Sequence, residues 1–124
     1  MRNLVVVLGD QLSTSSVAFE GFDAAQDRVW MAEVREESEH VPSTRMRTAI
    51  FLSAMRHFAE ALTSRGMPLE YLKLGTHRFD SIGNVLADTL SRHRPQAVVM
   101  TEAGDWRLEQ AIADVCQAAG VPLR

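Results

Sequence analysis

The sequence predicts an α/β fold: a Rossmann-like open parallel sheet of four to five strands with helices on both faces. Two observations lead to this fold class. Short runs rich in valine and leucine, typical of strands buried on both faces of a sheet, recur along the chain. From the second run onward they alternate with amphipathic helical patterns, and such alternation favours parallel strands joined by right-handed crossovers.

One domain over residues 1–124 is expected, because a chain of 124 residues has no room for two. Hydrophobic residues make up 46% of the sequence, enough for an ordinary core. The net charge of −3 argues against a basic clamp for nucleic acid. The one cysteine, Cys116, excludes an internal disulfide, so a reducing, cytoplasmic setting is expected. No stretch approaches the ~20 apolar residues of a membrane span, so no membrane partner is expected.

The first part of the chain predicts two strands with an irregular connection. Residues 4–8 form a continuous apolar run, and residues 28–34 read as a second strand. The crossover between them is the weak point of the alternating pattern. Only a short helix around residues 17–19 is expected there.

A long helix comes next. Ser43 or Thr44 could cap its first turn, and the helix is expected to end near Ser64. Gly66 suits the C-terminal stop, and Pro68 prevents continuation. Apolar side chains at helical spacing form its buried stripe: Phe51, Met55, Phe58 and Leu62.

Two further strand–helix units complete the pattern. Strands are expected at residues 69–74 and 96–101, and helices from residues 80–81 and over residues 106–119. Residues 121–124 read as the opening of a fifth strand. The buried helix faces are expected to be Ile82, Val85, Leu86 and Leu90 in one helix, and Leu108, Ile112, Val115 and Ala119 in the other.

In open α/β sheets, ligands bind beyond the carboxyl ends of the strands, where the strand order reverses. This rule selects four segments: residues 9–12, 33–37, 75–78 and 101–107. If the first and fourth strands are neighbours, the first and last of these segments flank the crevice.

Each candidate residue at the first two strand ends has two interpretations. Gly9 and Asp10 either complete the tight turn or open a binding site. Gln11 either contacts a ligand's carbonyl group or ring nitrogen, or is a solvated loop residue. Glu33, at a strand's carboxyl end, could accept hydrogen bonds from ligand hydroxyls. The acidic residues after it, Glu37 among them, more often form a solvated face.

Three later residues are also open to two interpretations. Trp106 could stack on a flat ring, although a tryptophan at a helix start more often anchors the helix to the core. Arg47 could balance an anionic ligand near the start of the long helix, or serve only solubility. His57 is expected at a helix surface or interface rather than as an acid–base catalyst.

Common catalytic and cofactor motifs are missing. The first strand is not followed by Gly-x-Gly-x-x-Gly, and the sequence has no Walker phosphate loop and no Gly-x-Ser-x-Gly elbow. The four histidines match no local metal motif. We therefore expect no catalytic residue in this chain.

Three segments resemble the deoxyribodipyrimidine photolyase-related proteins, the bacterial branch of the cryptochrome and photolyase superfamily that carries an iron–sulfur cluster. These segments are LVVVLGDQL at residues 4–12, FLSAMRHFA at residues 51–59 and TEAGDWR at residues 101–107. In the third, Ala103 stands where proline is usual. The segments occur in the family's order and span nearly the whole chain.

The resemblance implies an N-terminal α/β domain of a light-dependent DNA-repair or photoreceptor flavoprotein. Relatives bind FAD, a four-cysteine iron–sulfur cluster and DNA through a larger C-terminal helical domain that is not part of this sequence. That domain would be this chain's partner. The chain alone is expected to be inactive and to self-associate through the surface left uncovered.

The resemblance also implies an antenna chromophore, 6,7-dimethyl-8-ribityllumazine, which passes excitation energy to the flavin. The pocket implied by the resemblance uses Gly9, Asp10, Gln11 and Leu12, with Glu33 and Glu37 nearby and help from the start of the long helix. Together with Arg47 and Trp106, these are the predicted cofactor-binding residues. Two alternatives stay open: an interaction domain without a chromophore, and an unrelated nucleotide-binding α/β module. The missing glycine motif counts against the second alternative.

Overall fold

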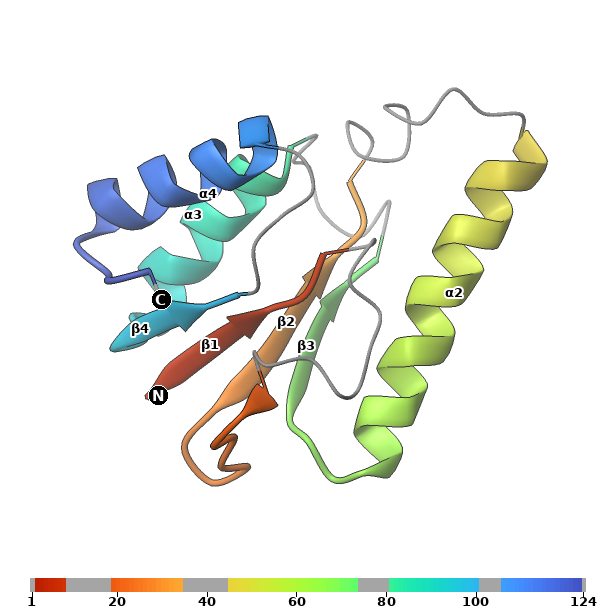
Figure 1. Ribbon diagram of the computed structural model, residues 1–124, viewed down its shortest axis with the longest axis horizontal. Helices are drawn as coiled ribbons and strands as arrows, with labels where there is room; N and C mark the ends of the chain where they lie inside the picture. Colours follow the sequence, from red (N-terminus) through yellow and green to blue (C-terminus); the bar gives the residue numbers. More distant parts are fainter. Residues whose placement is uncertain (1, 9–18, 35–44, 74–80, 101–105, 124) are drawn as a thin grey trace.

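A parallel sheet with a helical layer on each face forms the core of the computed structural model (Figure 1). The structure describes residues 2–8, 19–34, 45–73, 81–100 and 106–123, with side chains of the first long helix described from Leu52 onward. The elements in chain order are β1 (Asn3–Val6), β2 (Arg28–Ala32), α2 (Arg45–Ser64), β3 (Leu69–Leu72), α3 (Ile82–His93), β4 (Ala97–Val99) and α4 (Trp106–Ala119).

The strand order is β3-β2-β1-β4, and every pairing is parallel. Val5 in β1 pairs with Val29 in β2 on one side and with Val99 in β4 on the other. The chain therefore runs outward to one edge of the sheet, returns past β1 and continues on the other side. The predicted parallel sheet is confirmed, and the first and fourth strands are neighbours, which was the condition for a crevice between the segments that follow them.

The expected fifth strand is present as a single pairing. Leu123 forms an isolated parallel bridge with Val98, and the Val98 N–H donates to the Pro122 carbonyl over 2.9 Å. Residues 121–123 therefore run beside β4 on the side away from β1. The four named strands are each somewhat shorter than the segments predicted for them, although Val7 and Leu8 remain buried after β1 ends.

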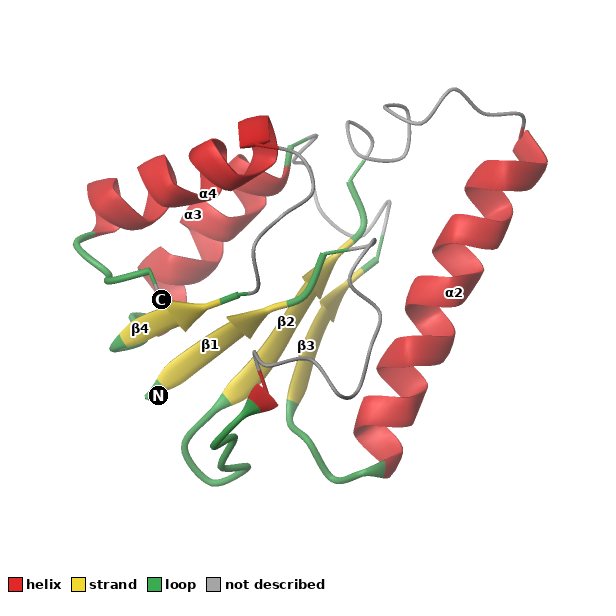
Figure 2. Ribbon diagram, in the orientation of Figure 1, coloured by secondary structure: helices red, strands yellow, loops and turns green. Residues whose placement is uncertain are grey.

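The two faces of the sheet are covered by different helices (Figure 2). Side chains alternate across a strand, so neighbouring residues enter different cores. Val5, Val7, Val29 and Met31 pack with α2, whereas Leu4, Val6, Leu8, Trp30 and Ala32 pack with α3 and α4. Each fully buried aliphatic side chain contributes roughly 1.5–3 kcal/mol. This two-sided burial explains why the strands read as continuous apolar runs.

Helix α2 follows its predicted boundaries. Met55, Phe58 and Leu62 are buried against the sheet as expected, while the side chain of Phe51 lies outside the described residues. Gly66 has φ +77°, the left-handed conformation that glycine adopts at a helix C-terminus without steric cost. The helix therefore ends where the sequence indicated, and the chain turns directly into β3.

Helices α3 and α4 pack side by side on the other face. The four apolar residues predicted for α3 are all buried, and the Ser81 hydroxyl caps the helix by accepting from the Asn84 N–H over 3.2 Å. In α4, the prediction for Ala119 was wrong. Ile112 and Cys116 are buried, whereas Ala119, in the last turn, is exposed. The contact stripe follows the i, i+4 step from Ile112 to Cys116 and ends there.

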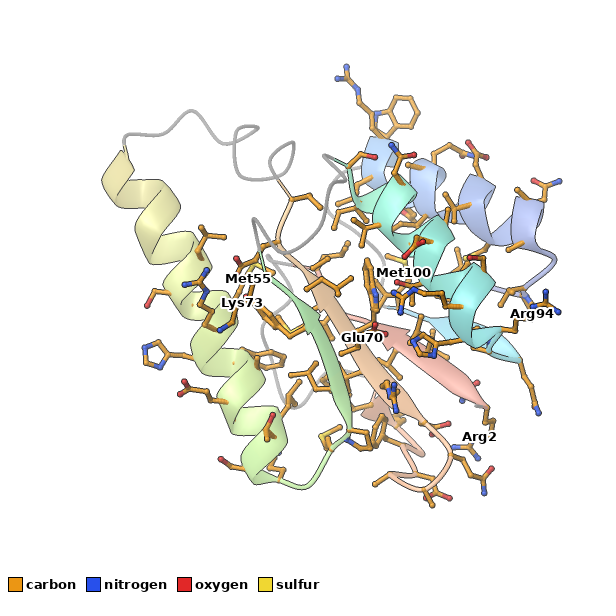
Figure 3. All side chains as sticks on the ribbon, turned by 180° about the vertical axis from the view of Figure 1, so that it is seen from behind. Arg2, Met55, Glu70, Lys73, Arg94 and Met100 are labelled. Atoms are coloured by element: carbon orange, nitrogen blue, oxygen red, sulfur yellow. The ribbon has the colours of Figure 1, made fainter. Side chains whose placement is uncertain are left out.

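An ion pair at the amino end of the sheet joins Arg2, just before β1, to Asp27, at the end of the connection that leads into β2. Asp27 accepts hydrogen bonds from Arg2 Nε at 2.9 Å and Nη2 at 2.6 Å, and from the backbone N–H groups of Asn3 and Asp23. Arg2 lies at this end in Figure 3. Of the short helix expected around residues 17–19, only Phe19 lies within the described residues, where it begins a turn.

Candidate functional site

The reversal of strand order between β1 and β4 fixes the topological switch point of the sheet. Both strands are parallel, so their carboxyl ends lie at the same edge. Residues 9–12 follow β1 and residues 101–105 follow β4, and both segments lie outside the described residues. Ligands of open α/β sheets bind beyond this point of reversal. The edge selected from the sequence is therefore the edge that the topology selects.

Glu33 comes directly after β2 at the same edge, and its side chain is fully buried. Arg56 on α2 donates to both carboxylate oxygens, from Nε to Oε2 and from Nη2 to Oε1, each over 2.9 Å. The hydroxyl of Tyr71 on β3 donates to Oε2 over 2.5 Å. We call this group the Glu33 cluster: Glu33, Arg56 and Tyr71. Its three side chains come from the residue just after β2, from α2 and from β3, and they join one helical layer to the ends of two strands.

The protonation states of Arg56 and Tyr71 suit their contact with the Glu33 carboxylate. The hydrogen bond to Glu33 and the charge of Glu33 raise the pKa of Arg56, so the guanidinium stays protonated. Burial raises the pKa of Tyr71 well above its ordinary value of 10.0, and the hydrogen bond to the Glu33 carboxylate raises it further. Both neighbours therefore act as donors. A bidentate guanidinium–carboxylate contact is among the stronger hydrogen-bond arrangements in proteins.

This geometry gives Glu33 a different set of partners from the ligand hydroxyls that the sequence suggested. The partners come from α2 and from β3, while the switch point lies on the other side of β2, between β1 and β4. The ligand role of Glu33 stays a prediction. Arg56 and Tyr71 were not among the predicted site residues. The available signal was positional: Arg56 follows a core methionine of α2, and Tyr71 lies two residues after Leu69 on the face of β3 that meets α2.

Trp106, the first residue of α4, is 72% exposed. Its interpretation as a core anchor is wrong, because the core contacts of α4 are made by Ile112, Cys116 and the half-buried Leu108 and Val115. Trp106 also belongs to the helical layer opposite α2. The Glu33 cluster and the helix that begins with Trp106 therefore lie on different faces of the sheet, and a ligand in contact with both would have to pass over the carboxyl edge.

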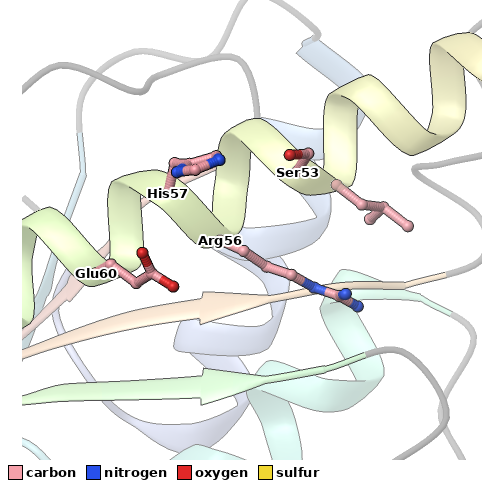
Figure 4. Close-up of a pocket in the computed structure, with 5 residues that line it drawn as sticks. Ser53, Arg56, His57 and Glu60 are labelled. Carbon is pink, nitrogen blue, oxygen red and sulfur yellow. The ribbon is translucent and has the colours of Figure 1, made fainter.

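A shallow depression of about 330 Å³ lies along the flank of α2. Leu52, Ser53, Arg56, His57 and Glu60 line it (Figure 4). Arg56 is about half exposed here and extends from the helix toward the strands. His57 is exposed, which confirms its expected place on the helix surface.

The remaining predicted site residues lie outside the part of the chain that the structure describes. They are Gly9, Asp10, Gln11, Leu12 and Glu37, and for Arg47 the helical backbone is described but the side chain is not. Among the described residues, no group of three or more histidine, cysteine, aspartate or glutamate side chains could hold a metal ion. No described helix is long and apolar enough to cross a membrane.

Comparison with known proteins places the chain in a family. The family model of the deoxyribodipyrimidine photo-lyase-related proteins matches residues 5–124. A (6-4) photolyase from Agrobacterium fabrum is 33% identical over 124 residues, which cover 98% of this chain. The chain spans 24% of the length of that relative.

Solved structures match the chain at low sequence identity. The 4-carboxy-2-hydroxymuconate hydratase GalB from Pseudomonas putida has a TM-score of 0.50 and 17% identity, over 96% of this chain and 55% of that one. A universal stress protein family protein from Arabidopsis thaliana, solved with AMP bound, has a TM-score of 0.49 and 14% identity, over 100% of this chain and 90% of that one. At this identity the likeness concerns the fold alone. On the match of the family model over residues 5–124, the chain belongs to the deoxyribodipyrimidine photo-lyase-related protein family.

Proposed function

We propose that this chain is the N-terminal antenna domain of a photolyase-related flavoprotein. In this proposal it holds 6,7-dimethyl-8-ribityllumazine at the carboxyl edge of the sheet and docks on a helical domain that binds FAD. One observation carries the proposal: in a chain of this family, β1 and β4 are neighbours, so residues 9–12 and 101–105 follow strands that end beside each other.

An antenna domain needs no catalytic residue, because it only has to bind the chromophore in a fixed position. When bound, the lumazine would absorb light and pass excitation energy through space to the flavin. The protein must hold a flat ring rigidly, in a mostly apolar cleft with a few directional polar groups. The described residues supply a rigid frame, since Leu8 and Val34 are buried where the first two strands leave the sheet. Polar contacts are expected from Asp10, Gln11 and Glu37.

The iron–sulfur cluster of the family does not fit the residues of this chain. A four-cysteine cluster needs four thiolates, and the sequence has one cysteine. Cys116 is 1% exposed, packed in the core beside Ile112, and burial raises the pKa of its thiol. The cluster, the FAD and the contacts to DNA are therefore assigned to the helical domain, and repair or photoreception would require both parts.

The test is a titration of the purified chain with 6,7-dimethyl-8-ribityllumazine, followed by fluorescence anisotropy. We expect saturable binding that Asp10→Ala abolishes and that Asp88→Ala, on the distant helix α3, leaves unchanged. The same titration is repeated on the full-length parent protein, because the helical domain could complete the pocket. Absence of saturable binding in both proteins would overturn the antenna proposal.

A second candidate function is an interaction domain without a chromophore, and the exposure of Trp106 favours it. A large aromatic side chain that is 72% exposed is a common anchor of protein interfaces. Under this alternative the full-length parent binds no lumazine, yet replacing Trp106 weakens the contact with the helical domain. The family match excludes the third interpretation, an unrelated nucleotide-binding module.

The chain alone is expected to lack repair activity, because we assign the binding of the electron-donating flavin to the helical domain. Illumination of the chain with DNA that carries cyclobutane or (6-4) dimers tests this, with the full-length parent as the positive control. A light-dependent loss of either lesion with the isolated chain would contradict the assignment.

A further inference from the structure

Two buried carboxylates in the described residues are each held by a bidentate arginine, at opposite ends of the sheet. Asp27, with 1% of its side chain exposed, is held by Arg2 at the amino end. Glu33, with none of its side chain exposed, is held by Arg56 at the carboxyl end. The two arginines are similarly exposed, at 39% and 48%. Two chemically similar pairs therefore lie within the described ranges, and one of them is at the carboxyl edge that holds the proposed site.

The Glu33 pair differs from the Asp27 pair in what it connects. Arg2 and Asp27 flank the starts of two adjacent strands, and the other donors to Asp27 are backbone N–H groups nearby. The Glu33 carboxylate is held by two side chains from separate elements, Arg56 from the middle of α2 and Tyr71 from β3. In addition, the Glu33 N–H donates to the Leu72 carbonyl over 2.8 Å. The Glu33 cluster therefore fixes the end of β2, the end of β3 and α2 against one another.

We propose that Arg56 and Tyr71 are positioning residues for the antenna site and act on it through Glu33. The inference rests on the proposed function. In it, the cluster sets the points at which the chain leaves β2 toward residues 35–44 and leaves β3 toward residues 74–80. These segments include Glu37 and follow two of the strand ends that the fold directs toward a ligand.

The bonding of Glu33 supports an indirect role. Oε1 accepts from Arg56, and Oε2 accepts from both Arg56 and Tyr71. A ligand hydroxyl would have to compete with three charge-assisted hydrogen bonds for these oxygens, and the carboxylate has no exposed surface at which to do so. Glu33 therefore acts on the site indirectly, by holding the ends of β2 and β3 and helix α2 in place. In metal sites, a residue that orients a ligating side chain commonly lowers affinity when it is replaced, and a residue that orients a site-forming segment acts by the same logic.

Tyr71→Phe is the main test variant. It removes one hydroxyl from the cluster and keeps the ring that packs against α2. Arg2→Gln is the matched control, because it breaks the similar pair at the far end of the sheet. Arg56→Lys is added because it keeps a positive charge beside the buried carboxylate. The variant protein should therefore fold more readily than one with a neutral residue at this position. Near-ultraviolet circular dichroism establishes that each variant is folded at the assay temperature.

Three readouts are compared, in the chain and in the full-length parent protein. We expect the lumazine dissociation constant to rise roughly tenfold in Tyr71→Phe and Arg56→Lys, and to be unchanged in Arg2→Gln. We expect the limiting anisotropy of the bound lumazine to fall in the first two variants, because a loosened frame lets the ring move. Amide hydrogen exchange should accelerate in peptides covering residues 30–36 and 70–75 in these variants, whereas Arg2→Gln should accelerate it only near residues 2 and 27.

The exchange readout separates this inference from the proposed function. If the wild-type protein binds no lumazine, the antenna proposal fails. Unchanged hydrogen exchange around residues 30–36 in Tyr71→Phe would separately overturn the positioning role of the cluster. If the wild-type protein binds lumazine but Tyr71→Phe and Arg2→Gln have equal effects on affinity, anisotropy and exchange, the cluster is only a source of stability and the inference is wrong.

Discussion

Trp30 and Thr89 are joined by a hydrogen bond inside the larger core: the indole Nε1 donates to the threonine Oγ1 over 3.0 Å. Both residues have an exposed fraction of 0%. The Thr89 hydroxyl in turn donates to the Val85 carbonyl over 3.1 Å. One hydroxyl thus satisfies the only polar group of a buried tryptophan and ties β2 to α3.

Thr89→Val should destabilise the fold, because it leaves the indole N–H of Trp30 buried without its acceptor. The expected loss is about 1–3 kcal/mol in the free energy of unfolding. Urea unfolding followed by far-ultraviolet circular dichroism measures it. Thr89→Ser, which keeps the hydroxyl, is the control and should lose much less. A Thr89→Val variant as stable as the wild-type protein would show that the hydrogen bond does not contribute.

Arg94→Gly should stabilise the fold. Arg94 caps α3 in the left-handed conformation, with φ 46° and ψ 60°, and its N–H donates to the Leu90 carbonyl. Glycine adopts this conformation without the Cβ penalty, so the gain is expected to be about 1 kcal/mol. Urea unfolding again measures the effect. Arg94→Ala keeps the Cβ atom and should bring no such gain; a similar gain in both variants would point to the arginine side chain instead of the backbone.

The acid stability of the fold should depend on Asp27. Burial alone would raise the pKa of this carboxyl group, but the hydrogen bond from Arg2, the Asp23 N–H, the charge of Arg2 and the Asn3 N–H outweigh burial and hold the pKa below its ordinary value of 3.8. A carboxyl group whose folded pKa is lowered stabilises the fold above its unfolded pKa, and this contribution is lost as the pH falls through the folded pKa.

Asp27→Asn should therefore flatten the dependence of stability on pH below about pH 4. Urea midpoints at a series of pH values from neutral to strongly acidic measure this slope in the wild-type protein and in the variant. The variant will also be less stable at neutral pH, so the informative quantity is the slope. An unchanged slope in the variant would assign the acid sensitivity to other carboxyl groups.

Tyr71 should resist ionisation in the folded protein. It is the one tyrosine of the sequence, so tyrosinate absorbance reports it alone. Burial and the hydrogen bond to the Glu33 carboxylate raise its pKa, so the fold gains stability below about pH 10 that is lost as the pH rises toward the folded pKa. Glu33→Gln removes the negative charge and should bring the titration to lower pH. A wild-type titration near pH 10 without unfolding would contradict the geometry of the cluster.

The fold could be predicted from the sequence because its signals are local. Continuous apolar runs follow from burial on both faces, and Gly66 and Ser81 mark helix ends through backbone conformation and capping. The Glu33 cluster could not be predicted, since Arg56 and Tyr71 meet Glu33 only after the strands are ordered as β3-β2-β1. Charged and aromatic residues separated by 23 and 38 positions carry no periodic signal of contact.

The exposure of Trp106 was mispredicted for a related reason. A tryptophan at a helix start suits a core anchor by local pattern, and whether its ring meets the core depends on how α4 lies on α3. The helices meet through Ile112, Cys116 and Val115, toward the middle and end of α4. The first turn of α4 therefore presents its aromatic ring to solvent.

Trp106 should govern self-association of the isolated chain and docking of the parent's helical domain, which we propose share one surface. Removing a 72% exposed indole takes away apolar area that a partner would cover, with little cost to the core. Light scattering over a range of concentrations should show association of the wild-type chain that Trp106→Ser reduces. Gln110→Ser, one turn further along α4 and also exposed, is the matched control.

The two tryptophans make the same surface visible by fluorescence. Trp30 is buried and Trp106 is exposed, so quenching by iodide should report Trp106 and should decrease as the chain associates. Trp106→Ser should leave an emission that iodide barely quenches at every concentration, because Trp30 alone remains. A wild-type chain that stays monomeric at high concentration, with Trp106 freely quenched throughout, would count against this surface as an interface between copies. If iodide also quenches Trp106 in the full-length parent, Trp106 is not covered by the helical domain, and its proposed role in docking is wrong.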